Sequence, residues 1–173
     1  MTFPIEIGDF NITFQDTEII RFWESHSLDA YLCPAGKWTI SWGITGSDVY
    51  EGLTITQAQS EQMFSNKIEF FACSIYPLIQ KKINKEQFIA LLSFAYNAGV
   101  ASLRSSTLLK KLNAGVISEV PQQFLKWKYA TINGKKVILR GLVKRRLSES
   151  ELFRLGELRF NFPKNLVDKH MKV

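Results

Sequence analysis

Three amphipathic segments that each end on a glycine most strongly constrain how this chain folds. They cover 85–99, 106–115 and 141–156, and each carries apolar residues at helical spacing. A glycine just past the last periodic residue is a common end of an α-helix, because glycine adopts a left-handed conformation there without strain. The segment 120–130 adds a further helix, with Pro121 near its first turn. The second half of the chain is therefore predicted to be a group of helices.

A short helix and a small sheet are predicted in the first half. The apolar spacing favours a helix over about 16–25, with Asp16 or Thr17 as its N-cap. The segment 30–45 that follows is rich in Tyr, Trp, Thr and Ile. Its Pro-Ala-Gly sequence at 34–36 is typical of a turn, so the segment is predicted to form a β-hairpin or small sheet.

A long helix is predicted over about 56–80. Thr56 is a good N-cap, and Gln59 three residues later completes a capping box. Pro77 is expected to end or kink this helix, because proline lacks the backbone N–H that a helix interior requires. The Asn-Gly pair at 133–134 predicts a tight turn between two short apolar runs.

These elements predict one domain, 1–173, built as two lobes. An N-terminal lobe and its long helix cover about 16–80, a helical lobe covers 81–155, and 156–173 forms an extra C-terminal tail. The fold class is α+β, mainly α, and a cleft between lobes is a usual place for a substrate.

The net charge of +6 arises from 22 Lys and Arg against 16 Asp and Glu. It favours an anionic partner, although modest basicity also serves solubility alone. The basic run 134–146 is compatible with nucleic acid, because Lys and Arg track phosphates. The run also fits a hairpin leading into an amphipathic helix, and no nucleic-acid-binding motif accompanies it. We therefore expect no nucleic-acid partner.

The two cysteines, Cys33 and Cys73, lack the paired spacing of a zinc site, and His26 and His170 lie far from them in sequence. We expect no metal, no cofactor and reduced thiols, with a Cys33–Cys73 disulfide left open. The N-terminus lacks the basic start and apolar run of a signal peptide. No stretch approaches ~18 continuous apolar residues, so we expect no stable membrane insertion.

Glu24 stands at the end of the first predicted helix, where the helix dipole disfavours a carboxylate. It is followed by Cys33 after eight residues and by Thr39 after five more. A solvated carboxylate, a small buried thiol and a strand threonine are the ordinary interpretations of these three residues. A carboxylate placed unfavourably beside an aromatic-rich hairpin instead suggests a functional role.

The spacing Glu24-x8-Cys33-x5-Thr39 resembles the catalytic signature of the phage-type lysozymes, glycoside hydrolase family 24. Further segments resemble family blocks in the family order, and the resemblance covers about 16–155. These segments are GLTITQAQ at 52–59, SFAYNAG at 93–99, STLLKKLN at 106–113, FLKW at 124–127 and GLVKRR from 141. Several ordered blocks are more specific than one short motif. The resemblance implies a two-lobe, lysozyme-like fold with a small β lobe and a helical C-terminal lobe.

The resemblance also implies roles for single residues. Glu24 is the proton donor, which requires surroundings that let it hold a proton. Cys33, where better-known members have Asp, orients a water or acts as a base when ionised. Thr39 helps to fix the attacking water. Arg145 matches an arginine that pairs with the catalytic glutamate, although a solvent-facing arginine fits the run equally well.

Two further residues are candidates for substrate binding or support. Asn97 aligns with a polar position that contacts substrate, although a capping role at a helix end is an equal reading. Tyr31 lies within the matched hairpin, two residues before Cys33.

The chain departs from the family pattern in three places. Ser41 stands where a glycine is usual, and Ile44 stands where a structural histidine is usual, which puts the stability of the lobe in question more than catalysis. The tail from 157, which contains LRFNF, lies outside the match and reads as a possible strand or interface.

The resemblance implies a muramidase or endolysin that hydrolyses the β-1,4 bond between N-acetylmuramic acid and N-acetylglucosamine in bacterial peptidoglycan. Without a signal peptide, it is expected to stay in the host cytoplasm until a holin releases it to the cell wall or periplasm. The alternative is a catalytically inactive, lysozyme-like domain that binds peptidoglycan or serves as a scaffold.

Overall fold

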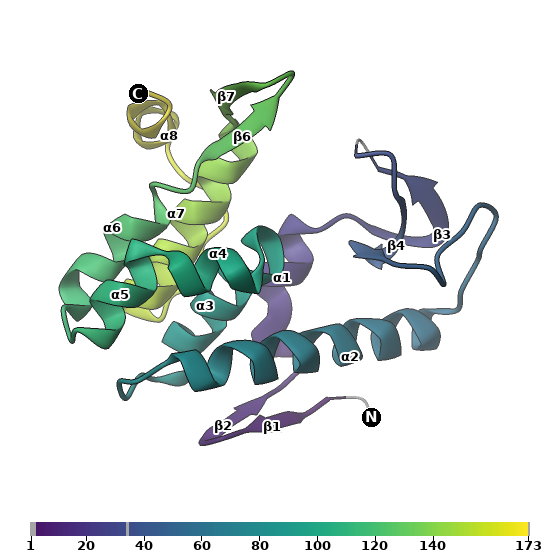
Figure 1. Cartoon of the computed structure of the whole chain (residues 1–173), viewed down its shortest axis with the longest axis horizontal. Helices are drawn as coiled ribbons and strands as arrows, with labels where there is room; N and C mark the ends of the chain where they lie inside the picture. Colours follow the sequence, from purple (N-terminus) through teal and green to yellow (C-terminus); the bar gives the residue numbers. More distant parts are fainter. Residues whose placement is uncertain (1–2, 34, 173) are drawn as a thin grey trace. The chain divides into compact units, whose positions relative to one another are not determined.

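A computed structural model describes residues 3–33 and 35–172 and confirms an α+β, mainly helical architecture (Figure 1). The chain divides into two compact units, Met1–Tyr76 and Pro77–Val173, which are described separately below as unit 1 and unit 2. Among the described residues, no helix combines the length and apolar character needed to cross a membrane.

Unit 1 begins with a hairpin that the sequence analysis did not predict. Strands β1 (Ile5–Ile7) and β2 (Phe10–Ile12) pair antiparallel, with Ile5 opposite Ile12. A 3₁₀ turn over Gln15–Thr17 then leads into helix α1 (Glu18–Trp23).

Of the two predicted N-cap residues, Thr17 holds the N-cap position of this first helix, but its side chain makes no capping hydrogen bond. The Asp16 carboxylate accepts hydrogen bonds from the backbone and hydroxyl of Thr13, both at 2.8 Å. Thr17 precedes α1, but its hydroxyl donates back to the carbonyl of Phe14 at 2.7 Å instead of accepting from the helix. Both side chains therefore stabilise the turn before the helix.

The predicted sheet forms and has three strands. Strands β3 (His26–Leu32), β4 (Trp38–Trp42) and β5 (Ile44–Thr45) pair antiparallel in chain order. Of the predicted turn at 34–36, Pro34 lies outside the described residues, and Gly36 has a φ of 72°.

One face of the sheet covers a small apolar cluster made of Ile40, Val49 and Ile55. Ile44 packs against this cluster. The residue that replaces the usual histidine therefore adds apolar contact to unit 1.

Helix α2 (Gln57–Ile75) follows, and its start confirms the predicted capping box. The Thr56 hydroxyl accepts from the backbone of Gln59, whose side chain accepts from the backbone of Thr56. Pro77 lies in the 3₁₀ turn Tyr76–Leu78 directly after the helix, as predicted.

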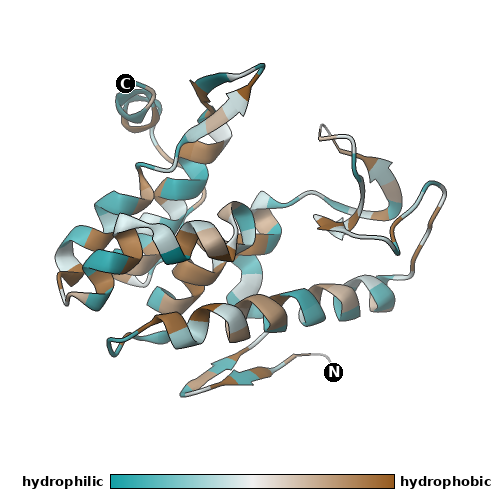
Figure 2. Ribbon diagram, viewed as in Figure 1, coloured by the Kyte–Doolittle hydropathy of each residue, from teal (hydrophilic) through white to brown (hydrophobic). Residues whose placement is uncertain are grey.

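Unit 2 is mainly helical, and helix α3 (Lys85–Ala98) lies at its centre. Residues 88–96 are all buried, and the helix is coloured as hydrophobic over most of its length (Figure 2). It ends at Gly99 as predicted, with a φ of 92°. The shorter helices that follow are α4 (Val100–Ser105), α5 (Thr107–Asn113), the 3₁₀ turn Ile117–Glu119 and α6 (Val120–Phe124).

The helix predicted over 120–130 was too long. Helix α6 ends at Phe124, and Tyr129 begins strand β6 (Tyr129–Ile132), which pairs with β7 (Lys135–Ile138). The cross-strand pairing of Tyr129 with Ile138 outweighs the local helical pattern. The Asn133-Gly134 turn between these strands is confirmed, because both residues have positive φ.

Two helices complete unit 2. Helix α7 (Arg140–Leu155) ends on Gly156, which is left-handed as predicted. The tail forms no strand at LRFNF and instead ends in helix α8 (Lys164–His170). Val167 of α8 forms an apolar cluster with Val143 and Leu147 of α7, so the tail docks on the last long helix.

Candidate active site

The sheet of unit 1 brings three of the predicted site residues together. Tyr31 on β3 lies opposite Thr39 on β4. Cys33 follows β3 directly, and its backbone N–H donates to the Lys37 carbonyl at 3.0 Å. Because β3 and β4 pair as a hairpin, Cys33 and Thr39, which are six residues apart in the sequence, lie close together in space.

Cys33 is a free thiol, as is Cys73. Hydrogen bonds from the Lys37 backbone and the Thr39 side chain, followed by one from the Ala35 backbone, lower the pKa of Cys33 despite partial desolvation. A hydrogen bond to the ionised form favours ionisation. The turn therefore favours the thiolate, which is the nucleophilic and basic form of cysteine.

Glu24 enters the same region from the end of α1. Its backbone N–H bonds to the Ile20 carbonyl at 3.1 Å, and its own φ and ψ of −98° and 137° turn the chain into an extended path. This confirms its predicted place at the helix end. The carboxylate lies against Gly43, where a Cβ would stand 2.9 Å from Oε2 of Glu24. Glycine at 43 therefore leaves the space that Glu24 occupies.

Tyr31 shares the electrostatic environment of both residues. Burial raises the pKa of the Tyr31 phenol, and the charges of Cys33 and Glu24 raise it further. Tyr31 is therefore a neutral hydroxyl at neutral pH, placed where it can donate a hydrogen bond to an anionic or sugar oxygen.

Lys67 on α2 is a member of the site that the sequence analysis missed. Its ammonium donates to the Gly43 carbonyl at 2.8 Å. Burial lowers the pKa of Lys67, and the nearby Glu24 carboxylate opposes that shift. A lysine on an amphipathic helix is usually solvated. The one feature of the sequence that indicated burial of Lys67 is its position about one turn after Phe64, which is buried.

A buried polar network supports the strand that carries Thr39. Ser41 has a φ of 54°, and its hydroxyl lies 2.8 Å from the hydroxyl of Ser60, which lies 3.0 Å from Nε2 of His26. His26 in turn stacks on Trp42 with ring centroids 4.1 Å apart. Ser41 thus adopts a left-handed conformation, which glycine tolerates best, and its hydroxyl adds a hydrogen bond.

The two remaining predicted residues, Arg145 and Asn97, belong to unit 2. Arg145 is buried, donates to Oε1 of Glu149 at 3.3 Å and to the Ser93 carbonyl at 3.2 Å. Its pairing with the catalytic glutamate stays a prediction. Asn97 is exposed near the end of α3 and accepts from Arg146 at 2.6 Å. It lines a cavity of about 420 Å³ together with Arg146 and with aromatic and aliphatic side chains, among them Trp127.

Comparison with known proteins confirms the resemblance. The sequence profile of the Phage lysozyme family matches residues 21–149. The endolysin of Acyrthosiphon pisum secondary endosymbiont phage 1 is 38% identical over 135 residues, which is 78% of this chain and 92% of that protein. The SAR-endolysin of Enterobacteria phage P21 is 36% identical over 134 residues, 78% of this chain and 79% of that protein.

Among solved structures, the endolysin from Escherichia coli O157:H7 phage FAHEc1 aligns with a TM-score of 0.82 and 30% identity, over 88% of this chain and 98% of that chain. The fold and sequence are those of a lysozyme-type glycoside hydrolase. The chain belongs to the phage lysozyme family, and its activity is that of an endolysin muramidase, which degrades peptidoglycan.

Proposed function

We propose that the chain hydrolyses the β-1,4 bond between N-acetylmuramic acid and N-acetylglucosamine, with Glu24 as general acid and with Cys33 and Thr39 holding the attacking water. The observation that carries the proposal is the grouping of these side chains around one small sheet in unit 1. Thr39 and Tyr31 lie on the sheet, Cys33 follows strand β3, and the charges of Glu24 and Cys33 act on Tyr31. Glycoside hydrolysis needs a proton donor for the leaving oxygen and a second group that activates water.

In the proposed reaction, the Glu24 carboxyl donates its proton to the glycosidic oxygen as the bond from that oxygen to C1 breaks. Water attacks C1 from the opposite face, oriented by the Thr39 hydroxyl. The Cys33 thiolate accepts the proton that this water loses, and solvent then returns both groups to their starting states. One water is consumed, and attack from the opposite face predicts inversion at C1.

Gly43 and Lys67 are proposed to position Glu24. Gly43 admits the carboxylate where any side chain would obstruct it. Lys67 fixes the Gly43 carbonyl and places a positive charge near Glu24. A small displacement of a catalytic group costs a large part of the rate, so both residues are expected to affect kcat.

The test is turbidity loss of purified peptidoglycan with the wild type, Glu24→Gln and Cys33→Ser. Glu24→Gln removes the proton donor and should lower kcat by about 10³-fold, whereas Cys33→Ser should lower it by about 10²-fold. Both variants should unfold at the wild-type temperature. Full activity of Glu24→Gln would exclude Glu24 as the acid, and an inactive wild type would favour a binding or scaffold protein.

The products distinguish hydrolysis from intramolecular transfer. Hydrolysis with inversion gives a reducing N-acetylmuramic acid end whose first-formed anomer is α, because the bond cleaved is β. Mass spectrometry identifies the end group, and NMR spectra recorded during turnover identify the anomer. A product without a reducing end excludes the water-based step.

We propose that a holin-made opening releases the protein from the host cytoplasm to the cell wall. The P21 relative is a SAR-endolysin, so the alternative is release from a membrane-anchored state. Expression in Escherichia coli with and without a co-expressed holin tests this. Lysis only with the holin supports the proposal, and lysis by the protein alone contradicts it.

A further inference from the structure

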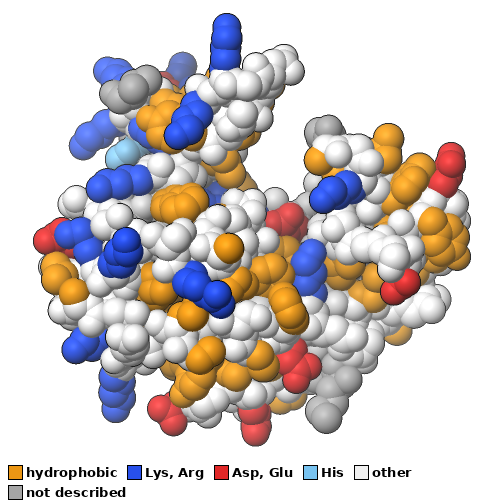
Figure 3. Space-filling view, viewed as in Figure 1, with side chains coloured by type: hydrophobic (Ala, Val, Ile, Leu, Met, Phe, Trp, Pro, Cys, Tyr) orange, Lys and Arg blue, Asp and Glu red, His pale blue; other side chains and the backbone are white. Residues whose placement is uncertain are grey.

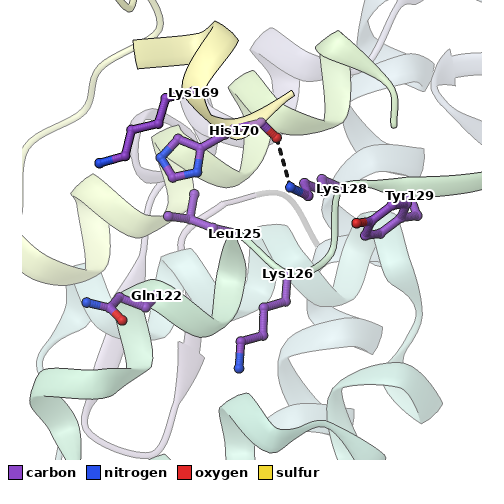
Figure 4. A pocket seen from close by; sticks show the side chains of 7 residues that line it. All are labelled: Gln122, Leu125, Lys126, Lys128, Tyr129, Lys169 and His170. Atoms are coloured by element: carbon purple, nitrogen blue, oxygen red, sulfur yellow. Dashed lines mark hydrogen bonds between the residues drawn. The ribbon is translucent and has the colours of Figure 1, made fainter. Parts of the chain in front are cut away.

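The C-terminal tail helps to form a second cavity in unit 2, which none of the predicted site residues lines and which shares Tyr129 with the cavity at Asn97. The cavity has a volume of about 550 Å³. Figure 4 shows side chains from α6 and the segment after it on one side and from the end of α8 on the other. The lining residues are Gln122, Leu125, Lys126, Lys128, Tyr129, Lys169 and His170. The last two lie beyond the segment 21–149 that matches the Phage lysozyme family.

Specific contacts hold the tail in place beside this cavity. The Lys128 ammonium donates to the backbone carbonyls of His170 at 2.9 Å and Lys172 at 2.7 Å, and Figure 4 shows the first of these bonds. A cation bound to the last carbonyls of a helix is favoured by the helix dipole. Lys128 therefore fixes the end of α8 while it leaves its charge at the cavity.

Two further contacts keep α8 on α7. Arg140 pairs with Asp168 at 2.6 Å, and Val167 is buried against Val143 and Leu147. The only carboxylate of α8 therefore points to a partner outside the cavity lining. The cavity wall is held by packing, charge and backbone hydrogen bonds together.

The cavity is strongly cationic. Three lysines and one histidine line it, and no Asp or Glu is among the described residues that do. Burial lowers the pKa of His170, and the charges of Lys169 and Lys128 lower it further. Figure 3 shows Lys and Arg side chains gathered around α8 and the β6–β7 hairpin. An anion that enters the cavity reduces this repulsion between cations.

We propose that this cavity binds the phosphate group of a phosphorylated sugar or polyol, with Lys126, Lys169 and His170 facing the phosphate. Lysine binds phosphate as a point charge, whereas a planar carboxylate is matched best by the fork of an arginine, and no arginine lines the cavity among the described residues. The volume exceeds that of one phosphate. Leu125 and Tyr129 supply an apolar wall against which a sugar or polyol can lie.

The chain offers a direct probe, because it contains only two histidines. His170 lines the cavity, and His26 lies in unit 1, where it contacts Ser60 and Trp42. The experiment follows both imidazole signals by NMR in the full chain as inorganic phosphate or glycerol phosphate is added. We expect the His170 signals to shift saturably and its pKa to rise, with His26 unchanged. Sodium chloride at the same ionic strength serves as the reference.

Variants locate the binding. Lys126→Gln and Lys169→Gln should each weaken binding by up to about fivefold, and the double variant should abolish saturation. Lys82→Gln is the matched control, because this exposed lysine lies outside the cavity lining. Tighter binding of glycerol phosphate than of inorganic phosphate supports a phosphorylated sugar or polyol as the ligand, whereas tighter binding of inorganic phosphate overturns that assignment in favour of the free ion. Equal His170 shifts in sodium chloride, or saturable binding that survives in the double variant, overturn the proposal.

Discussion

The two units place a glutamate in contrasting surroundings: Glu149 of unit 2 is fully buried among arginines, and Glu24 of unit 1 is half-buried against a glycine. Glu149 is fully buried on α7, where Ser93 donates to Oε1 at 2.8 Å and two arginines pair with its oxygens at 3.3 and 3.1 Å. Glu24 is half-buried at the end of α1, with the backbone of Gly43 against its carboxylate. Two guanidinium groups pair with the Glu149 carboxylate, whereas the proposed role of Glu24 as a general acid requires that it can hold a proton.

The buried polar groups of the two units differ in charge. Unit 2 buries the charges of Arg145, Arg146 and Glu149 together. Unit 1 supports its sheet with neutral groups, chiefly the hydroxyls of Ser41 and Ser60. Neutral hydroxyls thus brace the sheet without a buried ion pair, and Lys67 is the charged group that acts near Glu24. Buried ion pairs thus stabilise unit 2, whereas neutral hydroxyl groups stabilise the sheet of unit 1.

The largest expected effect comes from breaking the buried charge network. Glu149→Gln leaves two buried guanidinium groups without a compensating charge and should lower the free energy of unfolding by about 3–5 kcal/mol. Glu151→Gln is the matched control on the same helix, because Glu151 pairs with an exposed Arg154 at 2.9 Å. The control should cost less than about 1 kcal/mol. Urea unfolding measures both, and equal losses would contradict the structural role of Glu149.

Local patterns predicted much of the fold and the core of the site. The Thr56 capping box, the Gly99 helix end and the turn at 133–134 depend on neighbouring residues alone, and all three are confirmed. The apolar spacing of the first helix placed Glu24 at a helix end, and the composition of 30–45 placed a sheet directly after it, as observed.

Tertiary contacts account for what the sequence did not predict. Lys67 looks like a solvated helix residue until its distance to the Gly43 carbonyl is known. Helix α8 lacks a side-chain N-cap and depends on its contacts with α7. The predicted helix over 120–130 stops early because Tyr129 pairs with Ile138 in a strand, and a local pattern does not reveal a partner nine residues away.

The next effect concerns the space beside Glu24. Gly43 has a φ of 71°, and Gly43→Ala both strains the backbone and displaces the carboxylate. We expect a loss of about 1–2 kcal/mol in stability and of about 10²-fold in kcat. Gly52→Ala has a similar backbone cost at a φ of 79° but meets no atom within 4 Å. Peptidoglycan turnover and thermal unfolding of both variants should therefore separate strain, which they share, from displacement, which only Gly43→Ala causes.

A smaller effect tests the neutral network. Ser41→Ala removes a buried hydroxyl but keeps the unfavourable φ of 54°, and should cost about 1–2 kcal/mol in stability. Ser41→Gly removes the same hydroxyl and also relieves the strain, so it should cost about 1 kcal/mol less. Calorimetry measures the difference between them. If both variants lose the same stability, the left-handed conformation at position 41 carries no strain.

The smallest effect concerns the thiol that completes the site. The Thr39 hydroxyl has one hydrogen, which it donates to the Lys37 carbonyl at 3.0 Å and can turn toward the Cys33 sulfur as the thiolate forms. Thr39→Val removes this donor and should raise the pKa of Cys33. Less thiolate is then present at a given pH, and because the thiolate is the nucleophile, alkylation of Cys33 at pH 7 should be slower than in the wild type.

Peptide mapping by mass spectrometry follows this reaction at each cysteine separately. The exposed Cys73 provides the internal control, since its alkylation should not change in Thr39→Val. In the wild type, the rate at Cys33 should rise with pH and level off at a lower pH than in the variant, because hydrogen bonds favour the ionised sulfur. Superimposable pH curves for the two proteins would mean that the backbone donors of the turn alone set the ionisation of Cys33, leaving Thr39 to act only on the water.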